Sequence, residues 1–533
     1  MKYIFILFSL FITSTAFALE CPKEDQSTPL CPTSGATLLD DTYPVQAFVI
    51  SNSGFTTNKS EADAVPVSFM NNIIESYSEN NYDNLPQMIF SATTPADYER
   101  LKKSLEDKLK EKNIPEETRA KIIGQVSYRQ AMSYTWQQDY FESFFNPATG
   151  KPVLRKVSDY DSKMNINTGK INDLAAAGKS CGISSGEDLK SDPKSADING
   201  EMGGNIEGAP GGFCMVGDNQ GADFTKSFCK SDDNIIQINT SWLTVGHVDE
   251  IFKIIPTNID DGRPKECQFS LMAASPAKGL ELLKSPQYGR ENVFGSDNIL
   301  PENADKYFNK KPTDGTAVTF CAVLKNISSK KSVAPPAATP GNRSVLDETL
   351  GLFISETLAG AKPTQDSSET CKDRIKKTSN YDFGAELSEN KDFMALNTAI
   401  QNSIDSDKAK IKEKILSRLP QCKAFFDKSV LEVPNIFMTN GGNPTELDSA
   451  GKPVLRKGLG IVNSVYPNPS NSVVMNKTIL FPDPENKAYS SYLNEEMKKK
   501  GMKFKALTSW DYAHTGNGNI HCASHSLNHC RVK

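Results

Sequence analysis

Short apolar segments of strand length alternate with helical patterns along this chain, and that alternation constrains the fold more than any other feature of the sequence. Residues 87–90 (Gln-Met-Ile-Phe) and 235–238 (Ile-Ile-Gln-Ile) have the length and composition of buried strands. Residues 95–110 begin at a proline and repeat leucine from Leu101 to Leu109, which predicts a helix. Strands that alternate with helices predict an α/β architecture.

The same alternation continues into the C-terminal part of the chain. Residues 473–475 and 478–481 predict a β-hairpin, and residues 489–500 predict the helix that follows it. A long helix is predicted over residues 389–419, directly before a proline. Residues 19–84 lack this pattern and are mostly polar at first, so we expect them to form an N-terminal extension.

The first residues have the order of features of a secretory signal peptide. Lys2 precedes an apolar stretch, which is followed by the small-x-small sequence Ala16-Phe17-Ala18. We expect residues 1–18 to be removed and the mature chain to be secreted, into an extracellular or periplasmic compartment. No later stretch approaches the ~20 apolar residues of a membrane-spanning helix, so we expect no membrane contact in the mature form.

Export into an oxidising compartment would make the cysteines interpretable, because most of them would then pair. The chain has 11 of them, so pairing would leave at least one free. We expect disulfides among Cys21, Cys31, Cys181, Cys214, Cys229, Cys267, Cys321, Cys371, Cys422 and Cys530. This leaves Cys522, although the odd number alone does not single it out. A lipoprotein anchor at Cys21 is an alternative, but Glu20 is not the small residue that such processing prefers.

The overall charge argues against one class of partner. The formal net charge is −5 and no run of basic residues interrupts the sequence, so we expect no nucleic-acid binding. Nothing in the sequence indicates an oligomeric state.

Polar and acidic side chains lie between aromatic ones in the segment from Thr135 to Glu142. Buried carboxylates require a cation, a metal or hydrogen bonds, so such a segment is unusual in a hydrophobic core. The alternative is a partly exposed strand edge with one aromatic face.

His247 stands alone in the middle of the chain, within the sequence Trp242-Leu-Thr-Val-Gly-His-Val-Asp-Glu250. If this segment is a strand, His247 and Asp249 lie on the same face, because side chains in strands repeat every second residue. A structural histidine without a catalytic role is an equally good interpretation.

The other four histidines occur in the last 20 residues, around Cys522. A glycine-rich turn before Ile520-His521-Cys522 would present a thiol to a cleft. Two alternatives remain open, which are a disulfide cysteine and a zinc site. The zinc site would draw on His521, Cys522, His525, His529 and Cys530.

Taken together, these three segments resemble the catalytic domain of the protein-arginine deiminases, in the guanidino-modifying (pentein) superfamily. Trp136-Gln-Gln-Asp139, the His247 segment and Asn519-Ile-His-Cys522 occur in the family's order. The resemblance implies that residues 85–533 are the catalytic domain and that the fold is a five-bladed α/β propeller of ββαβ modules with long insertions. It implies a hydrolase of linear amidines, which converts arginine in proteins or peptides to citrulline and ammonia.

The resemblance also implies a role for each site residue. An arginine guanidinium can be held by two carboxylates through charge-assisted hydrogen bonds while a thiolate attacks its carbon. The matching positions are Asp139 and Asp249 for the carboxylates, Cys522 for the nucleophile, His247 for proton transfer, and Trp136 and Val245 for the aliphatic part of the arginine.

A calcium site is implied in part. The matching ligands are the side chains of Gln138, Glu142 and Glu207 and the backbone carbonyls of Gly203 and Ile206, an oxygen set that suits calcium. Tyr140 stands where the family has a carboxylate for a neighbouring site. Two other functions remain open, which are hydrolysis of a small guanidine such as free arginine or agmatine, and a secreted binding protein without catalytic activity.

Overall fold

The computed structural model describes residues 21–22, 28–33, 35, 37–52, 59–130, 135–157, 169–186, 201–288, 291–292, 378–439, 444–456, 458, 460–510 and 512–533. The expected signal peptide, Cys321 and Cys371 lie outside the described residues.

Four three-stranded sheets repeat one order of elements, in which an antiparallel pair is followed by helix and then by a strand parallel to the second. The first unit consists of β4 (Phe141–Phe145), β5 (Pro152–Lys156), α6 (Gly169–Ala177) and β6 (Ser184–Ser185). The second unit consists of β7 (Ile206–Ala209), β8 (Phe213–Gly217), α7 (Ala222–Cys229) and β9 (Ile235–Ile238). The others are β10 (Phe252–Pro256), β11 (Phe269–Ser275), α8 (Pro276–Leu283) and β12 (Val430–Pro434), then β17 (Val473–Met475), β18 (Thr478–Pro482), α16 (Lys487–Lys499) and β19 (Lys503–Leu507). The fold is therefore a mixed α/β fold, as the sequence predicts.

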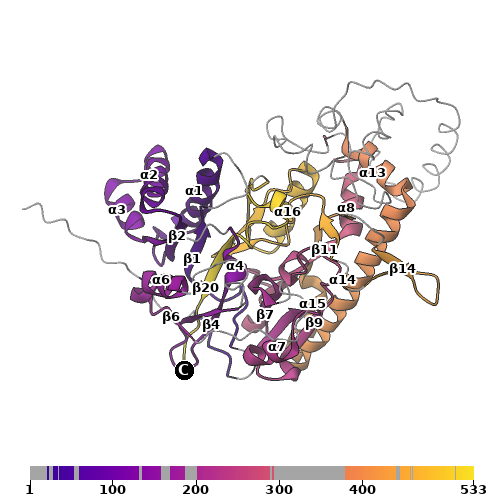
Figure 1. The fold of residues 1–533 in the computed structure, drawn as a ribbon, viewed down its shortest axis with the longest axis horizontal. Helices are drawn as coiled ribbons and strands as arrows, with labels where there is room; N and C mark the ends of the chain where they lie inside the picture. The colour runs from indigo at the N-terminus through magenta and orange to yellow at the C-terminus, as the bar shows by residue number, and fades with distance from the viewer. Residues whose placement is uncertain are drawn as a thin grey trace, which may run out of the picture.

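A fifth sheet joins the two ends of the chain. Its order is β20-β1-β2-β3, with β20 (Ser524–Asn528) antiparallel to β1 (Val45–Ser51). The strands β2 (Gln87–Ala92) and β3 (Val126–Gln130) continue it in parallel, and Figure 1 shows α1 (Lys59–Ser76), α2 (Pro95–Glu111) and α3 (Glu116–Gly124) beside it. Residue 85 is the expected start of the catalytic domain, and this sheet includes one strand before it, β1, and three strands after it. It places β20, which directly follows Cys522, next to the first strand.

A long helix packs against two of these sheets. The helix α14 (Lys391–Arg418) follows α13 (Asn380–Glu389), precedes α15 (Lys423–Ser429) and confirms the predicted long helix. It buries Ile400, Ile404 and Ile411 in a core cluster with residues of β9 and β11. Among the described residues, no helix has both the length and the apolar character needed to cross a bilayer.

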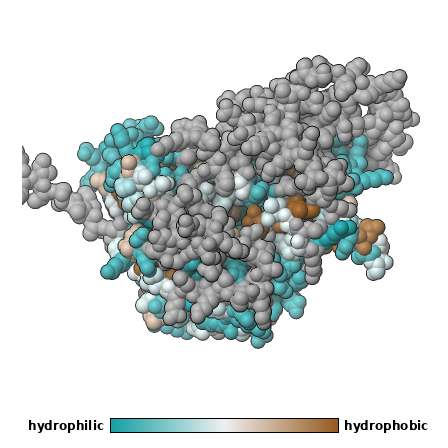
Figure 2. Space-filling model, viewed as in Figure 1, coloured by the Kyte–Doolittle hydropathy of each residue, from teal (hydrophilic) through white to brown (hydrophobic). Residues whose placement is uncertain are grey.

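Two short pairs of strands complete the described elements, β13 (Phe437–Thr439) with β16 (Val462–Ser464) and β14 (Thr445–Leu447) with β15 (Pro453–Leu455). The second pair projects from the body in Figure 1 and carries Leu447, whose side chain is 71% exposed. Apart from hydrophobic colour at this place and a few other small areas, the described surface in Figure 2 is mostly hydrophilic.

Of the nine cysteines in the described residues, eight form disulfides and Cys522 is free and buried. The pairs are Cys21–Cys181, Cys31–Cys530, Cys214–Cys229 and Cys267–Cys422. The prediction that Cys522 remains unpaired is therefore confirmed. The disulfides also occupy Cys21, which argues against the lipoprotein anchor, and Cys530, which removes one ligand of the alternative zinc site.

Candidate active site

Three segments that are far apart in the sequence bring four predicted residues into one buried site. Asp139 lies in the short helix α4 (Gln137–Tyr140), His247 and Asp249 lie at the 3₁₀-helix η6 (Val248–Glu250), and Cys522 precedes β20. All four side chains are buried. The backbone N–H of Gln138 donates to the carbonyl of Cys522 at 3.1 Å, which fixes α4 against the nucleophile segment.

The predicted strand through His247 is wrong, because the chain turns there. Gly246 has φ +85°, in the left-handed region that glycine tolerates, and His247 is the N-cap of η6. The backbone N–H of His247 donates to the Glu250 carboxylate at 3.0 Å. His247 and Asp249 therefore meet through a capped turn. The partly exposed strand edge at 135–142 is also wrong, since the four residues of α4 are buried.

A glycine lies between the catalytic candidates. A Cβ added at Gly204 would lie 2.6 Å from His247 Nδ1 and 3.2 Å from Asp249 Oδ2. The backbone of Gly204 also forms a hydrogen bond with the Asp139 carboxylate. Only a residue without a side chain can approach all three groups in this way. His247 Nδ1 also lies 3.6 Å from Asp139 Oδ1.

Asn471 connects the thiol to a carboxylate, and the sequence did not identify it. Its Nδ2 donates to Cys522 Sγ at 3.1 Å and to Asp249 Oδ2 at 2.8 Å. Its Oδ1 accepts the backbone N–H groups of His521 and Cys522 at 3.0 and 3.2 Å. Cys522 Sγ also lies 3.5 Å from Asp249 Oδ2. A single buried amide thus holds the thiol beside the carboxylate.

The site has an excess of buried negative charge. Burial raises the pKa of Asp139 well above its usual value, and Asp249 raises it further. Burial also raises the pKa of the Cys522 thiol, to which Asp249 and Asp139 add. Within the described part of the chain, Asp139 Oδ1 and Asp249 Oδ1 are buried without a hydrogen-bond partner. Two such acceptors next to a thiol can accept hydrogen bonds from a positively charged donor.

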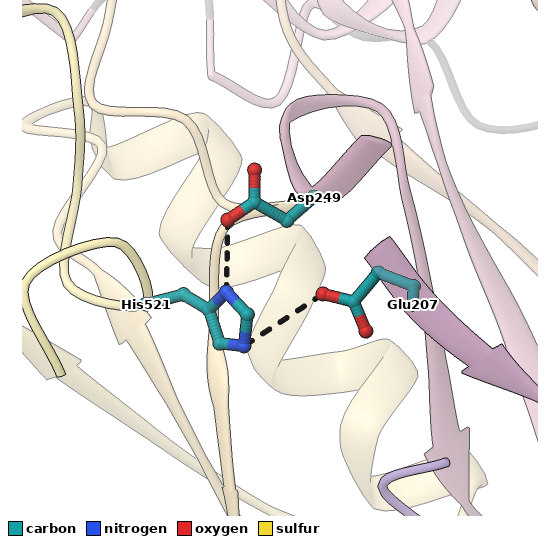
Figure 3. Close-up of side chains that lie close together, drawn as sticks. All are labelled: Glu207, Asp249 and His521. Carbon is teal, nitrogen blue, oxygen red and sulfur yellow. Dashed lines mark hydrogen bonds and ion pairs between the residues drawn. The ribbon is translucent and has the colours of Figure 1, made fainter. Parts of the chain in front are cut away.

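His521 lies on the other side of Asp249. Figure 3 shows its ring between two carboxylates, with Nδ1 2.8 Å from Asp249 Oδ2 and Nε2 3.8 Å from Glu207 Oε1. These three side chains are close enough to hold a metal ion together. From the sequence, Glu207 was predicted to bind calcium and Asp249 to hold the guanidinium. His521 was named as a ligand only for the alternative zinc site.

The comparison with known families identifies the chain. Residues 220–359 and 358–533 match the family model described as protein-arginine deiminase (PAD). The chain belongs to the protein-arginine deiminase family. Val245, His247, Asp249 and Cys522 lie within the matched residues, whereas Asp139 and all five predicted calcium ligands precede them. Membership supports a hydrolase that acts on a guanidino group.

Solved structures of deiminases resemble this family member only distantly. Agmatine deiminase of C. jejuni is 11% identical, with 93% of this chain and 96% of that chain covered and a TM-score of 0.40. Agmatine deiminase of Enterococcus faecalis is 10% identical, with 95% and 99% covered and a TM-score of 0.36. No curated protein matches the chain significantly. The family assignment therefore rests on the family model.

Two residues, Trp136 and Val245, were predicted to contact the aliphatic part of the arginine. Trp136 and Val245 are each half-buried, so part of both side chains is accessible. A Cβ added at Gly518 would lie 2.5 Å from the Trp136 ring, so the glycine-rich segment before Cys522 packs directly on the indole. The predicted roles of both residues stay predictions.

The predicted calcium ligands of this deiminase converge on a small polar cavity of about 30 Å³. Its lining includes Gln138, Glu142, Ile206 and Glu207, and also Asp41 and His525. Gly203 adjoins it, since a Cβ there would approach the Gln138 carbonyl and lie 3.0 Å from Glu142 Oε2.

The charges in this cavity fit a cation. Burial raises the pKa of Glu142 well above its usual value, and Glu207 adds to the shift. Burial likewise raises the pKa of Glu207 to about 7. Glu207 Oε1 has no hydrogen-bond partner among the described residues. Lys253 Nζ, 3.8 Å from Glu207 Oε1, compensates part of this charge, and the oxygen donors of the cavity can hold a metal ion.

Proposed function

We propose that this protein converts arginine residues in proteins or peptides to citrulline and ammonia through a covalent amidino-cysteine. One observation carries the proposal. Two buried carboxylate oxygens, Asp139 Oδ1 and Asp249 Oδ1, lack hydrogen-bond partners among the described residues and lie in the site of the free thiol Cys522. A guanidinium supplies five N–H donors and a permanent positive charge. It would therefore provide the hydrogen bonds that the two oxygens lack and the positive charge that the two carboxylates require.

In the first half of the proposed reaction, Cys522 attacks. In the free protein the thiol is protonated at neutral pH, because burial and the two carboxylates raise its pKa. A guanidinium bound between Asp139 and Asp249 brings a positive charge to the thiol and favours the thiolate. The thiol gives its proton to His247, and Sγ forms a bond to the guanidinium carbon. His247 gives a proton to one terminal nitrogen, the bond from carbon to that nitrogen breaks, and ammonia leaves.

In the second half, water replaces the thiol. His247 takes a proton from a water molecule, whose oxygen bonds to the amidino carbon. The bond from carbon to Sγ breaks, the departing thiolate takes the remaining proton of the new oxygen, His247 releases its proton to solvent, and the product is citrulline. Throughout, Asn471 Nδ2 donates to Sγ, which stabilises the thiolate both as nucleophile and as leaving group.

We also propose that the cavity holds calcium, through the side chains of Gln138, Glu142 and Glu207 and the carbonyls of Gly203 and Ile206. Calcium supplies positive charge and fixes its ligands in place. Gln138 and Gly203 directly precede Asp139 and Gly204, so fixed ligands would hold both of these residues beside His247 and Asp249.

Two further proposals concern architecture and location. The five sheets of related order are proposed to be the blades of a five-bladed α/β propeller, which a crystal structure tests. The disulfides support secretion after removal of residues 1–18, and N-terminal sequencing of the exported protein tests it. A start at Leu19 is expected, and a protein that keeps Met1 contradicts it.

Ammonia release from three substrates tests the proposed reaction. We expect turnover of an arginine peptide with blocked termini, loss of that turnover in Cys522→Ser, and weak turnover of free arginine and agmatine. Preference for agmatine or free arginine would replace the protein substrate by a small guanidine. No turnover of any of the three, with calcium or with chelator, would favour a binding protein.

A further inference from the structure

The segment that precedes β1 forms one side of the predicted calcium cavity. Residues 37–41, called the N-terminal wall below, contribute Leu38, Leu39 and Asp41 to the lining of that cavity. The predicted ligands come from residues 138–142 and 203–207, so the wall supplies none of them. One side of the cavity is therefore built by a part of the chain that the sequence predicted only as an N-terminal extension.

The N-terminal wall joins two successive units of the fold. The backbone N–H of Phe145 in β4 donates to the carbonyl of Thr37 at 2.8 Å, so the wall begins along the edge of the first unit. A Cβ added at Gly208 in β7 would lie 2.6 Å from the carbonyl of Leu39, so the wall packs backbone to backbone on the second unit. These two strands also carry the two glutamates of the predicted calcium site.

Asp41 places a third carboxylate at the cavity, beside those of Glu142 and Glu207. Its Oδ2 lies 2.6 Å from Lys253 Nζ and its Oδ1 lies 3.4 Å from Asn528 Nδ2. A carboxylate offers about four lone-pair sites, so these contacts hold the side chain in place and leave it able to bind a cation. In the same cavity, Glu207 Oε1 is buried without a hydrogen-bond partner among the described residues. Three carboxylates that meet around one lysine still lack a positive partner.

Both ends of the N-terminal wall are fastened to the C-terminal segment of the chain. Before the wall, Cys31 forms a disulfide with Cys530. After it, the carbonyl of Pro44 accepts the backbone N–H of His529 at 3.0 Å. A disulfide restricts the chain covalently, and a ligand that is already held in place loses less conformational entropy when it binds. The wall is therefore positioned to bind a cation without rearrangement.

We propose that the N-terminal wall is part of the calcium site and that Asp41 is a further ligand in it, held in place by the disulfide between Cys31 and Cys530. The proposal rests on the proposed function in one respect, because it requires that the cavity binds calcium. Calcium affinity depends on the number of charged ligands and on the rigidity of the site. Asp41 contributes to the first of these and the disulfide to the second.

Calorimetric titration of calcium chloride into protein that has been freed of metal by chelation tests the role of Asp41 without measuring activity. We expect Asp41→Asn to weaken calcium binding about 10-fold or more, because it removes a charged ligand. Asp40→Asn is the matched control. Asp40 is the adjacent buried carboxylate and lies outside the lining of the cavity, and an asparagine oxygen can still accept the backbone N–H of Thr42. This variant should bind calcium with nearly the wild-type affinity.

A second variant tests the wall without changing any charge, because Asp41→Asn removes one partner of a buried ion pair and can prevent folding. Cys31→Ser/Cys530→Ser removes the disulfide that anchors the wall. We expect it to bind calcium more weakly than the wild type at a temperature well below its Tm. Cys267→Ser/Cys422→Ser removes a disulfide whose cysteines lie outside the lining of the cavity, and it should keep the wild-type affinity.

Wild-type affinity in Asp41→Asn, or equal losses in Asp41→Asn and Asp40→Asn, would overturn the proposed ligand. Equal affinities in the two disulfide variants would overturn the role of the anchor. Glu207→Gln separates these failures from a failure of the proposed calcium cavity. If Glu207→Gln weakens binding and Asp41→Asn does not, only the ligand Asp41 is excluded. If the wild type binds no calcium, or Glu207→Gln binds it as tightly as the wild type, the proposed cavity fails as well.

Discussion

Replacing Asn471 with alanine tests the connection between thiol and carboxylate. The change removes the N–H donor 3.1 Å from Cys522 Sγ and the donor 2.8 Å from Asp249 Oδ2. A hydrogen bond to a charged group is worth about 1.5–3 kcal/mol, and about 1.4 kcal/mol corresponds to tenfold in rate. If the bond to the thiolate exists in the transition state, kcat/KM should fall about 10- to 150-fold.

The same change should reduce stability. It leaves the backbone N–H of Cys522 without its acceptor, which costs about 1–3 kcal/mol for a buried donor. The N–H of His521 loses less, because it also contacts the carbonyl oxygen of Asn471 at 3.4 Å. Denaturant unfolding measures this effect, and ammonia release from a blocked arginine peptide measures the loss of activity.

Asn468→Ala is the matched control. Asn468 is also buried, donates to the carbonyl of Glu250 at 2.6 Å and accepts from the Ser470 N–H at 3.0 Å. It therefore loses comparable hydrogen bonds, none of which involves the thiol. We expect similar destabilisation with a much smaller loss of kcat/KM. Equal losses of activity in the two variants, or near-native activity of Asn471→Ala, would refute the reasoning.

Three further changes test other parts of the site and fold. Gly204→Ala should nearly abolish activity in a folded protein, because its Cβ would lie 2.6 Å from His247 Nδ1. Turnover near the native rate would contradict this, since it would mean that the site accommodates the methyl group without displacing His247. Asp139→Asn should lower kcat/KM sharply with little loss of stability, since burial raises the pKa of Asp139 and the folded state gains by losing the charge; a large destabilisation would contradict this. Burial raises the pKa of Glu485 from 4.5 to about 8, so the unfolded chain releases this proton first and stability should fall with rising pH between these values, by up to about 1.4 kcal/mol per pH unit. Glu485→Gln should remove that part of the slope in denaturation measured at pH 5 and pH 8, and an unchanged slope would contradict it.

Local patterns predicted the elements well because their causes are local. The buried strand at 87–90, the helix at 95–110, the hairpin at 473–481 and the long helix around 391–418 follow from apolar spacing, proline positions and turn residues. The segment around His247 misled the prediction, because a glycine with φ +85° and the cap between His247 and Glu250 override an apparent alternation. Both features depend on a turn that the apolar spacing does not reveal.

Site residues whose side chains have distinctive chemistry were predicted from the sequence, and those with ordinary side chains were missed. Asp139, His247, Asp249 and Cys522 carry groups with recognisable chemistry, and the structure places them together. Asn471 escaped notice, since an asparagine in a loop is ordinary in sequence. Its importance arises from a contact with Cys522, which is distant in the chain. Such contacts exist only after folding.

Mapping the covalent intermediate tests the central claim most directly. The protein is mixed with excess blocked arginine peptide, quenched in acid during turnover and digested, and each cysteine-containing fragment is weighed. We expect the mass of the amidino-peptide adduct on the fragment with Cys522 and on no other, and we expect neither adduct nor ammonia with Cys522→Ser. Ammonia release by Cys522→Ser at the wild-type rate, or an adduct on a different cysteine, would contradict the account.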